Sequence, residues 1–392
     1  EVIISKIFHN AYDFAQIIRI KSSNYSLYAL ILHQLYRIRG LDLFLKALDD
    51  SALSNEDKAD MICQCPLDLD AWRKLEGFDN KIVQHYWEHI DDVCFLNEGD
   101  EQADYYLSKL LLYKRPFSAV RVISFSRYSN SEMIINILRM CCELQNYTEP
   151  IGLSLNDLAQ DAILDLFNKL YNDQNVELNQ LVQLEIAFFS YFRFDFVPNG
   201  IIAYLLKNPV TYVELITYNY KADFNSEFSA SKYSYEQRHL AYQVINFFKI
   251  VPGCNGNLIS EKTFIDWISI AQGHAEHIGY MQSFFHCFGC LLSYAPVGSD
   301  GIFPHEIVRD YLEQNQNEKL VKGFVMEKQN QRGVYLATGG LAEKEISQKY
   351  REDASTIRIS YPYTAAILEK LADCYQQESL YEQKSELLDF RA

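Results

Sequence analysis

Helical spacing of apolar residues recurs along almost the whole chain, and this pattern restricts the possible folds more than any other feature. The spacing is clearest at 133–141, 158–170 and 363–375, where apolar residues return every three or four positions. Strand signals are weak: the neighbours of 120–125 favour a short helix, and only 333–336 favours an extended segment. We therefore predict an all-α fold, an irregular TPR-like or HEAT-like solenoid with a C-terminal helical bundle. An irregular, aromatic-rich helical bundle is the alternative.

Helix starts are marked by capping boxes, in which a serine precedes an acid or amide by three residues. Four serines fit this pattern, at Ser54, Ser129, Ser154 and Ser234. In each case the box precedes a stretch that continues as a helix. These four positions therefore predict four helix N-termini.

Glycine and proline interrupt the helical pattern every 15 to 25 residues or so, a spacing typical of helix-turn-helix units. Glycine-rich loops at 251–257 and 296–301 mark changes in the character of the chain. We predict N-terminal helical repeats over 1–150, central aromatic-rich repeats over 151–295, and a C-terminal helical region over 296–392.

Charge and hydropathy argue against two classes of partner. The chain has 36 basic and 52 acidic residues, and its net charge of -16 repels phosphate backbones. Its apolar run at 201–206 stops at Lys207, far short of the roughly 20 residues that a membrane crossing needs. We therefore expect no contact with nucleic acid and no membrane association.

Cysteine spacing and the N-terminal residues bear on the cellular compartment. The nine cysteines follow no disulfide pattern, which favours free thiols and a cytoplasmic location. The stretch 1–19 carries charges throughout and does not resemble a signal peptide. Because the first residue is Glu1 rather than Met, we expect a segment of a longer polypeptide, in which an effector or NTPase domain can lie upstream, with a processed chain as the alternative.

One segment gathers residue types that bind metals. His274 and His277 would share one helix face, and His286 and Cys290 another, with Cys287 beside them. Aromatic and aliphatic residues surround these thiols, so core histidines and buried thiols are the simpler interpretation. A zinc site built from these five residues is the alternative.

Catalytic motifs are missing from the sequence. No GxxxxGK[ST] loop, GxSxG elbow or HExxH pair occurs, and the adjacent acids in the chain would point to different helix faces. We therefore predict that this segment is not an enzyme and needs no cofactor.

Aromatic residues are unusually abundant, with 28 tyrosines and 24 phenylalanines. Their rings provide large contact area at low entropic cost, so some can line a recognition face while about two thirds fill cores. The candidates for a partner-binding face are Phe189, Tyr191, Phe192, Tyr212 and Tyr218.

From Asn208 onward the chain carries an ordered series of short motifs, at 208–215, 251–268, 300–309, 322–324, 330–334, 342–351 and 361–372. As a series they resemble a region of large multidomain bacterial proteins, some of which resemble antiviral STAND-type or other NTPase-linked defence proteins. The series covers roughly the last 185 residues. Where this pattern has a glutamine after paired glycines, the chain has Leu341 and Ala342. The resemblance implies a C-terminal helical region in a protein whose effector domain lies elsewhere.

The charged residues within these motifs have two interpretations. His305, Glu306 and Arg309 can pair along one helix that Asp300 caps, and Arg332 can bind carbonyls at a helix end. Alternatively, Arg309 and Arg332 form a fork that binds an anion. The first interpretation requires no ligand, because charged residues between helical layers need partners in any case.

Three functions follow from these observations. The main prediction is a non-catalytic scaffold or sensor module that recognises a protein partner and belongs to a larger bacterial, antiviral-type protein. A metal-stabilised or metal-dependent enzyme domain centred on 274–290 is the first alternative. The second is a structural scaffold that assembles into homo-oligomers through its aromatic surface.

Overall fold

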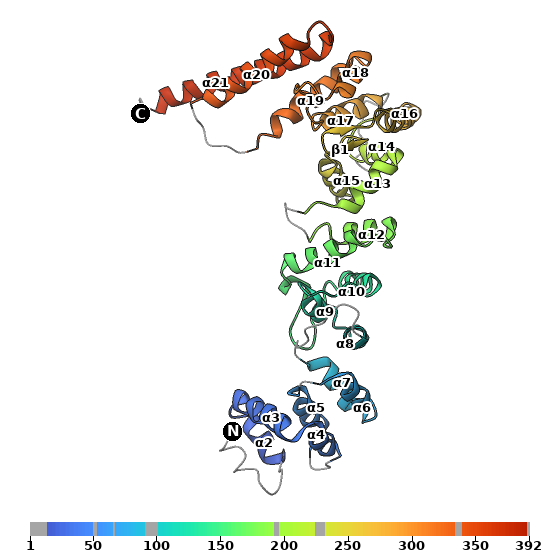
Figure 1. Ribbon diagram of the computed structural model, residues 1–392, viewed down its shortest axis with the longest axis vertical. Helices are drawn as coiled ribbons and strands as arrows, with labels where there is room; N and C mark the ends of the chain where they lie inside the picture. Colours follow the sequence, from blue (N-terminus) through green and yellow to red (C-terminus); the bar gives the residue numbers. More distant parts are fainter. Residues whose placement is uncertain are drawn as a thin grey trace. The chain divides into compact units, whose positions relative to one another are not determined.

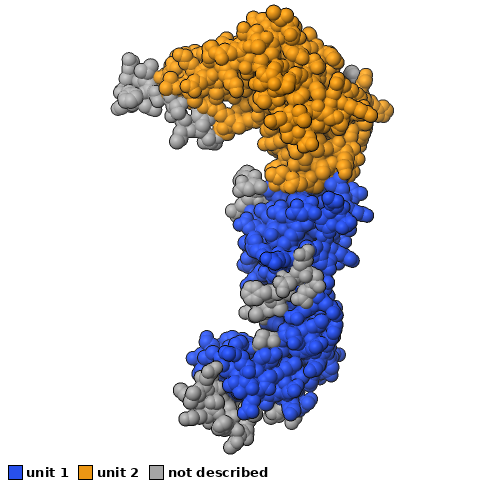
Figure 2. Space-filling view, in the orientation of Figure 1, with its two compact units in different colours: residues 1–196 blue, residues 197–392 orange. Residues whose placement is uncertain are grey.

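The structure is a computed structural model that describes residues 14–49, 53–65, 67–90, 101–191, 196–223, 232–333 and 339–389, except for the side chains of 15, 16 and 385–389. The chain divides into two compact units, Glu1–Phe196 and Val197–Ala392, coloured separately in Figure 2. Nearly all of the regular secondary structure described in both units is α-helical (Figure 1). The prediction of an all-α fold is confirmed.

Unit 1 is built from short helices that pack on the next helix or the next but one. In its second half α8 contacts α9 and α10, α9 contacts α11, and α10 contacts α11 and α12. Alternate helices therefore form two layers, as in a solenoid. The elements are α2 (Phe14–Lys21), α3 (Tyr25–Arg39), α4 (Leu41–Leu48), α5 (Asn55–Cys63), α6 (Leu69–Leu75), α7 (Asn80–His89), α8 (Glu101–Leu112), α9 (Pro116–Ile123), α10 (Ser131–Glu143), the 3-10 turn η1 (Leu155–Asp157), α11 (Gln160–Asn172) and α12 (Leu178–Phe188).

A buried ionic network ties the layers of unit 1 together. The guanidinium of Arg115 is fully buried and donates to the carbonyl oxygens of Trp87 and Ile90, at 3.0 and 2.7 Å. The Glu149 carboxylate lies 3.5 Å from Arg115 Nε and accepts from the backbone N–H groups that begin α9, among them that of Phe117 at 2.7 Å. Burial outweighs these hydrogen bonds and raises the pKa of Glu149. One ion pair therefore joins the end of α7, the start of α9 and the loop after α10.

Unit 2 contains longer helices and one small hairpin, in which Cys254 pairs with Ile259 and Asn255 with Leu258. Its helices also pack in order, with α14 on α15 and α16, α17 on α19, and α20 on α21. The elements are α13 (Asn199–Lys207), α14 (Pro209–Thr217), α15 (Tyr235–Phe247), β1 (Cys254–Asn255), β2 (Leu258–Ile259), α16 (Glu261–Ile278), α17 (Met281–Leu292), α18 (Glu306–Gln314), α19 (Glu318–Asn330), α20 (Leu341–Ile357) and α21 (Pro362–Asp389).

Two glycines let helices α17 and α19 of unit 2 approach backbone to backbone. A Cβ atom added to Gly323 would lie 2.0 Å from the carbonyl oxygen of His286, and one added to Gly289 would lie 2.0 Å from that of Leu320. Both glycines occupy helix interiors, where glycine is unfavourable by ~1 kcal/mol relative to alanine. The close contact explains why these helices carry glycine at these positions.

The capping boxes identified two of the four helix starts correctly. Ser54 caps α5, and Ser234 forms a complete capping box at the start of α15. The other two predictions need correction. Asn130 rather than Ser129 caps α10. Ser154 does form the predicted capping box with Asp157, but the helix that it opens is a single 3-10 turn, and α11 begins only at Gln160.

The remaining sequence predictions about the fold have mixed outcomes. The β-rich stretch 120–125 lies mostly in α9, as predicted, whereas 334–336 of the predicted extended piece falls outside the described residues. The predicted loop 251–257 includes β1. The predicted boundaries at 150 and 295 stay predictions, while the two compact units divide between Phe196 and Val197. Within the described residues, no helix is long and apolar enough for a membrane crossing.

Candidate functional site

Two of the aromatic residues predicted to face a partner are buried instead. Phe189 is 5% exposed and Tyr212 only 1%. The Tyr212 ring lies 5.4 Å from the rings of both Phe248 and Trp267, so it fills the core between α14, α15 and α16. Burial also raises the pKa of the Tyr212 hydroxyl. These two rings therefore stabilise packing rather than form an exposed face.

The other aromatic candidates are partly accessible or lie outside the description. Tyr191 is half-buried, and its hydroxyl donates to the carbonyl oxygen of Leu158 at 2.9 Å. The Tyr218 ring stacks on Tyr233 with their centroids 4.0 Å apart. Phe192 lies outside the described residues. Phe189 and Tyr191 belong to unit 1, and Tyr212 and Tyr218 belong to unit 2.

The proposed metal ligands lie on two helices, His274 and His277 on α16 and the other three residues on α17. His274 has its Nε2 atom 3.8 Å from a carboxylate oxygen of Glu214, on α14. Among the residues that the structure describes, no three His, Cys, Asp or Glu side chains are arranged to hold a metal ion.

His286, Cys287 and Cys290 instead line a cavity of about 140 Å³ in unit 2, together with several tyrosines. Burial raises the pKa of both thiols to about 12. Because metal binding and nucleophilic attack require the thiolate, this environment disfavours both. Tyr294 closes another part of the cavity, and its hydroxyl donates to the Glu327 carboxylate.

Arg309 is committed to contacts within its own unit. Its guanidinium is fully buried and binds both carboxylate oxygens of Asp300, at 2.6 and 2.8 Å. It also donates to the backbone carbonyl oxygens of Ile302 and Pro304. The hydrogen bonds from Arg309 lower the pKa of Asp300 to about 2. This network fixes the turn that precedes α18.

The remaining residues of the predicted polar network are also engaged locally. His305 caps α18 by accepting from the N–H of Ile307 at 3.3 Å, and Glu306 accepts from the N–H of Ser299 at 2.7 Å. Arg332 forms an ion pair with Glu343, which begins α20. Arg309 and Arg332 therefore bind different internal carboxylates and do not converge as an anion fork.

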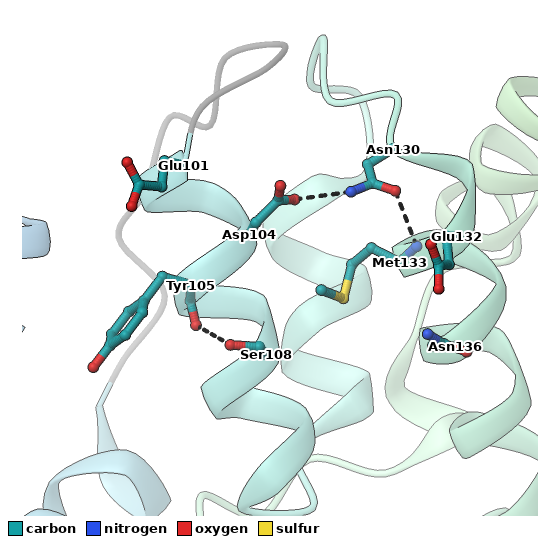
Figure 3. A pocket seen from close by; sticks show the side chains of 8 residues that line it. All are labelled: Glu101, Asp104, Tyr105, Ser108, Asn130, Glu132, Met133 and Asn136. Carbon is teal, nitrogen blue, oxygen red and sulfur yellow. Dashed lines mark hydrogen bonds between the residues drawn. The ribbon is translucent and has the colours of Figure 1, made fainter.

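A polar groove that was not predicted lies between α8 and α10 in unit 1 (Figure 3). Its volume is about 430 Å³, and Met133 and Tyr105 supply apolar surface. The lining includes Glu101, Asp104 and Glu132 but no lysine or arginine. The eight lining residues are Glu101, Asp104, Tyr105, Ser108, Asn130, Glu132, Met133 and Asn136.

Hydrogen bonds hold one wall of this groove in place. Asp104 accepts from the Asn130 amide at 3.1 Å and from the hydroxyl of Tyr128, whose pKa is raised chiefly by burial and then by this hydrogen bond. Asn130 in turn accepts from the N–H of Met133 at 3.2 Å (Figure 3). These hydrogen bonds fix the Asp104 carboxylate of α8 against Asn130, the N-cap residue of α10. Glu101 is paired with Arg73, at 2.5 Å.

A second groove of about 440 Å³ runs along the other side of α10, toward α12. It shares Asn130, Glu132 and Asn136 with the first, so these residues form a ridge between two grooves. Asp173 lies in the second groove, and hydrogen bonds from Ser131 and from the N–H of Asn175 lower the pKa of its carboxyl. The full lining is Asn130, Ser131, Glu132, Ile135, Asn136, Arg139, Asp173, Asn175, Val176 and Gln180.

Two residues of the ridge have side chains that are available to bind a ligand. Glu132 and Asn136 are exposed, lie one turn apart on α10, and make no side-chain hydrogen bond or ion pair within the described part of the chain (Figure 3). The sequence pattern placed Glu132 in a capping box with Ser129, which obscured its availability. Asn136 carries no sequence signal of its own.

In comparisons with known proteins, no family model, curated protein or solved structure matches this chain. The fold places it in the class of all-α, solenoid-like proteins, in which successive helices pack in chain order. Fold class alone does not determine function, whereas the groove and its ridge are local features that can bind a ligand.

Proposed function

We propose that this chain is a non-catalytic recognition module whose grooves along α10 bind an extended, positively charged segment of a protein partner. The observation that carries the proposal is the ridge formed by Glu132 and Asn136, which two grooves share. Both side chains are exposed, and neither has a partner in the described residues.

The arrangement of the grooves favours a polypeptide over a small molecule. Compact ligands bind in enclosed cavities that cover most of their surface. Here two open grooves of about 430 and 440 Å³ lie on either side of one helix. A ligand that uses both must cross α10, as an extended chain does. The Asn136 amide offers donors and an acceptor, which suits the alternating groups of a peptide backbone.

Electrostatics set the expected charge of the ligand. The groove between α8 and α10 has three carboxylates and no basic lining residue, although Arg73 partly neutralises Glu101. Arg139 is the basic residue in the lining of the second groove. Complementary charge chiefly provides specificity and faster association. Lysine or arginine on the partner can therefore pair with Glu132 and Asp104.

Selection from a displayed library of random 12-residue peptides, with this chain immobilised, tests the proposal. We expect the enriched peptides to carry lysine or arginine. Glu132→Lys is expected to weaken their binding ~tenfold or more, equivalent to ~1.4 kcal/mol. Replacement of Asn136 by alanine is expected to weaken binding less, because it removes hydrogen bonds without adding repulsion.

Asp161→Lys provides a matched control for Glu132→Lys. Asp161 is an exposed acid in the first turn of α11, as Glu132 is in the first turn of α10, so both substitutions change the charge and the helix terminus equally. Asp161 lines neither groove. Equal loss of binding in both variants would mean that the change in net charge, rather than the position of Glu132 in the groove, weakens binding. A selection that enriches no basic peptides would contradict the proposal itself.

We further propose that this module works in the cytoplasm as the sensing part of a larger bacterial protein whose effector domain carries out an antiviral response. The support is the ordered series of motifs from Asn208 onward, which resembles a region of such proteins. The genomic reading frame is the test. We expect it to encode an effector domain together with this module, and a frame without one would contradict the proposal.

A further inference from the structure

A groove of about 510 Å³ lies between α19 and α21 in unit 2, and it differs chemically from the grooves of unit 1. On α21 it is lined by Tyr363, Ala366, Ile367 and Lys370, which recur at helical spacing and form one stripe. The stripe covers seven residue steps, or ~10 Å along the helix axis. The groove is therefore long enough for about two turns of a helical ligand.

Apolar side chains form part of the surface of this groove. Ala366 of α21 is exposed, and the half-buried ring of Tyr363 lies at one end of the stripe, whereas Val321 and Ile367 are buried beneath them. A ligand with apolar side chains at helical spacing would cover this surface.

The charged lining is predominantly basic. Lys319, Lys322 and Lys370 are exposed, and their amines make no ion pair or hydrogen bond with the residues that the structure describes. Glu318 is the one acid in the lining. The lining thus has three amines and one carboxylate, whereas the whole chain has more acidic than basic residues, 52 against 36.

The helix N-termini beside the groove are already occupied. The Asn317 side chain accepts from the N–H groups of Lys319 and Leu320, at 2.8 and 3.3 Å. At the start of α21, the Glu313 carboxylate accepts from the N–H groups of Tyr363 and Thr364, at 3.1 and 2.7 Å. These backbone amides are therefore not free to bind a phosphate group.

We infer that the groove between α19 and α21 is a second docking site, which binds an acidic amphipathic helical segment of a partner protein. Carboxylates of the segment pair with Lys319, Lys322 and Lys370, while its apolar side chains contact Ala366 and the ring of Tyr363. The complementary charge and the apolar stripe favour this occupant. The inference concerns unit 2 alone and does not depend on the function proposed for the grooves of unit 1.

Fluorescence anisotropy with three labelled 14-residue peptides tests this inference on the full chain. The first contains glutamate, alanine and leucine, with the leucines at helical spacing. In the second, lysine replaces every glutamate, and in the third, alanine replaces every leucine. We expect the first to bind and the other two to bind at least ~tenfold more weakly, and raising the salt concentration to weaken the first because salt screens exposed charges.

Substitutions then locate the binding site. Lys322→Glu combined with Lys370→Glu is expected to weaken the first peptide ~tenfold or more. Lys262→Glu, at an exposed position on α16 outside the groove, changes one charge and is expected to leave binding within about twofold of the wild type. Thermal melts of all variants show whether unit 2 remains folded. If the double variant unfolds, Lys322→Gln is used instead, and it is expected to weaken binding less.

Three results would overturn the inference. Equal binding of the leucine-free peptide would mean that charge alone drives binding and that apolar contacts contribute nothing. Equal weakening by Lys262→Glu would place the effect outside the groove. Tighter binding of a DNA duplex or of anionic vesicles than of the first peptide, lost in the same double variant, would assign the groove to a different class of ligand.

Discussion

Replacing Gly323 with alanine perturbs the crossing of α17 and α19 in unit 2, where the two helices approach backbone to backbone. The added Cβ atom would lie 2.0 Å from the carbonyl oxygen of His286 and 3.1 Å from the backbone nitrogen of Cys290. Ordinary contacts between a Cβ atom and its neighbours begin near 3.4 Å. The helices must therefore separate locally by more than an ångström, which loosens the packing of Phe288 and Phe324.

The expected effect is the difference between two opposing terms. Alanine in a helix interior is favoured over glycine by ~1 kcal/mol. Overpacking a core typically costs ~1–3 kcal/mol, and the upper end applies here because a helical carbonyl oxygen cannot rotate away as a side chain can. The net destabilisation of unit 2 is therefore ~2 kcal/mol, which corresponds to a melting temperature ~4–8 °C lower for a unit of this size.

Thermal unfolding followed by the fluorescence of Trp267 measures this change, because its ring lies 6.1 Å from that of Phe288 on α17. Gly273→Ala is the matched control. Gly273 is also inside a helix, α16, but a Cβ atom there meets nothing within 4 Å. That variant is expected to gain ~0.5–1 kcal/mol. If Gly323→Ala were as stable as Gly273→Ala, the close crossing of α17 and α19 would be refuted.

Three further predictions follow from the buried groups. Arg115→Met leaves a buried carboxylate without its partner and is expected to destabilise unit 1 by ~3–5 kcal/mol, measured by chemical denaturation; a loss below 1 kcal/mol would contradict the ionic network. Arg309 lowers the pKa of Asp300 to about 2 from 3.8, so its stabilisation is present above the unfolded pKa and lost as pH falls through 2. Asp300→Asn is therefore expected to lower the melting temperature at pH 7 and to match the wild type near pH 2, and a constant difference would contradict the ion pair. Cys287 and Cys290, with pKa values near 12, are expected to react with iodoacetamide at pH 8 only after unfolding. Mass spectrometry after brief treatment of the native protein checks this, and rapid modification of either cysteine would contradict the prediction.

Local patterns in the sequence were sufficient to predict the all-α fold class. The stripe at 163–170 places Ile163, Leu166 and Leu170 on one face, and all three are buried without measurable exposure. The order of packing was harder to predict, because it depends on which stripes meet. Gly289 and Gly323 illustrate the limit. A glycine inside a helical pattern suggests close backbone approach, but the sequence does not identify the partner helix.

The candidate sites were less predictable than the fold. Aromatic abundance pointed to Tyr212, whose ring is buried in a core where such rings pack best. Glu132 and Asn136 have ordinary helical positions in the sequence. They become distinctive only when α8 and α12 lie on either side of α10, and that arrangement depends on contacts between helices rather than on local pattern.

A charge-swap experiment provides the sharpest test of peptide recognition along α10. It measures binding of one selected basic peptide, and of the same peptide with its lysines and arginines replaced by glutamate, to the wild type and to Glu132→Lys. The account predicts that the basic peptide prefers the wild type and that the acidic peptide regains affinity for Glu132→Lys but not for Asp161→Lys. Failure of the acidic peptide to bind Glu132→Lys better than the wild type would contradict recognition along α10.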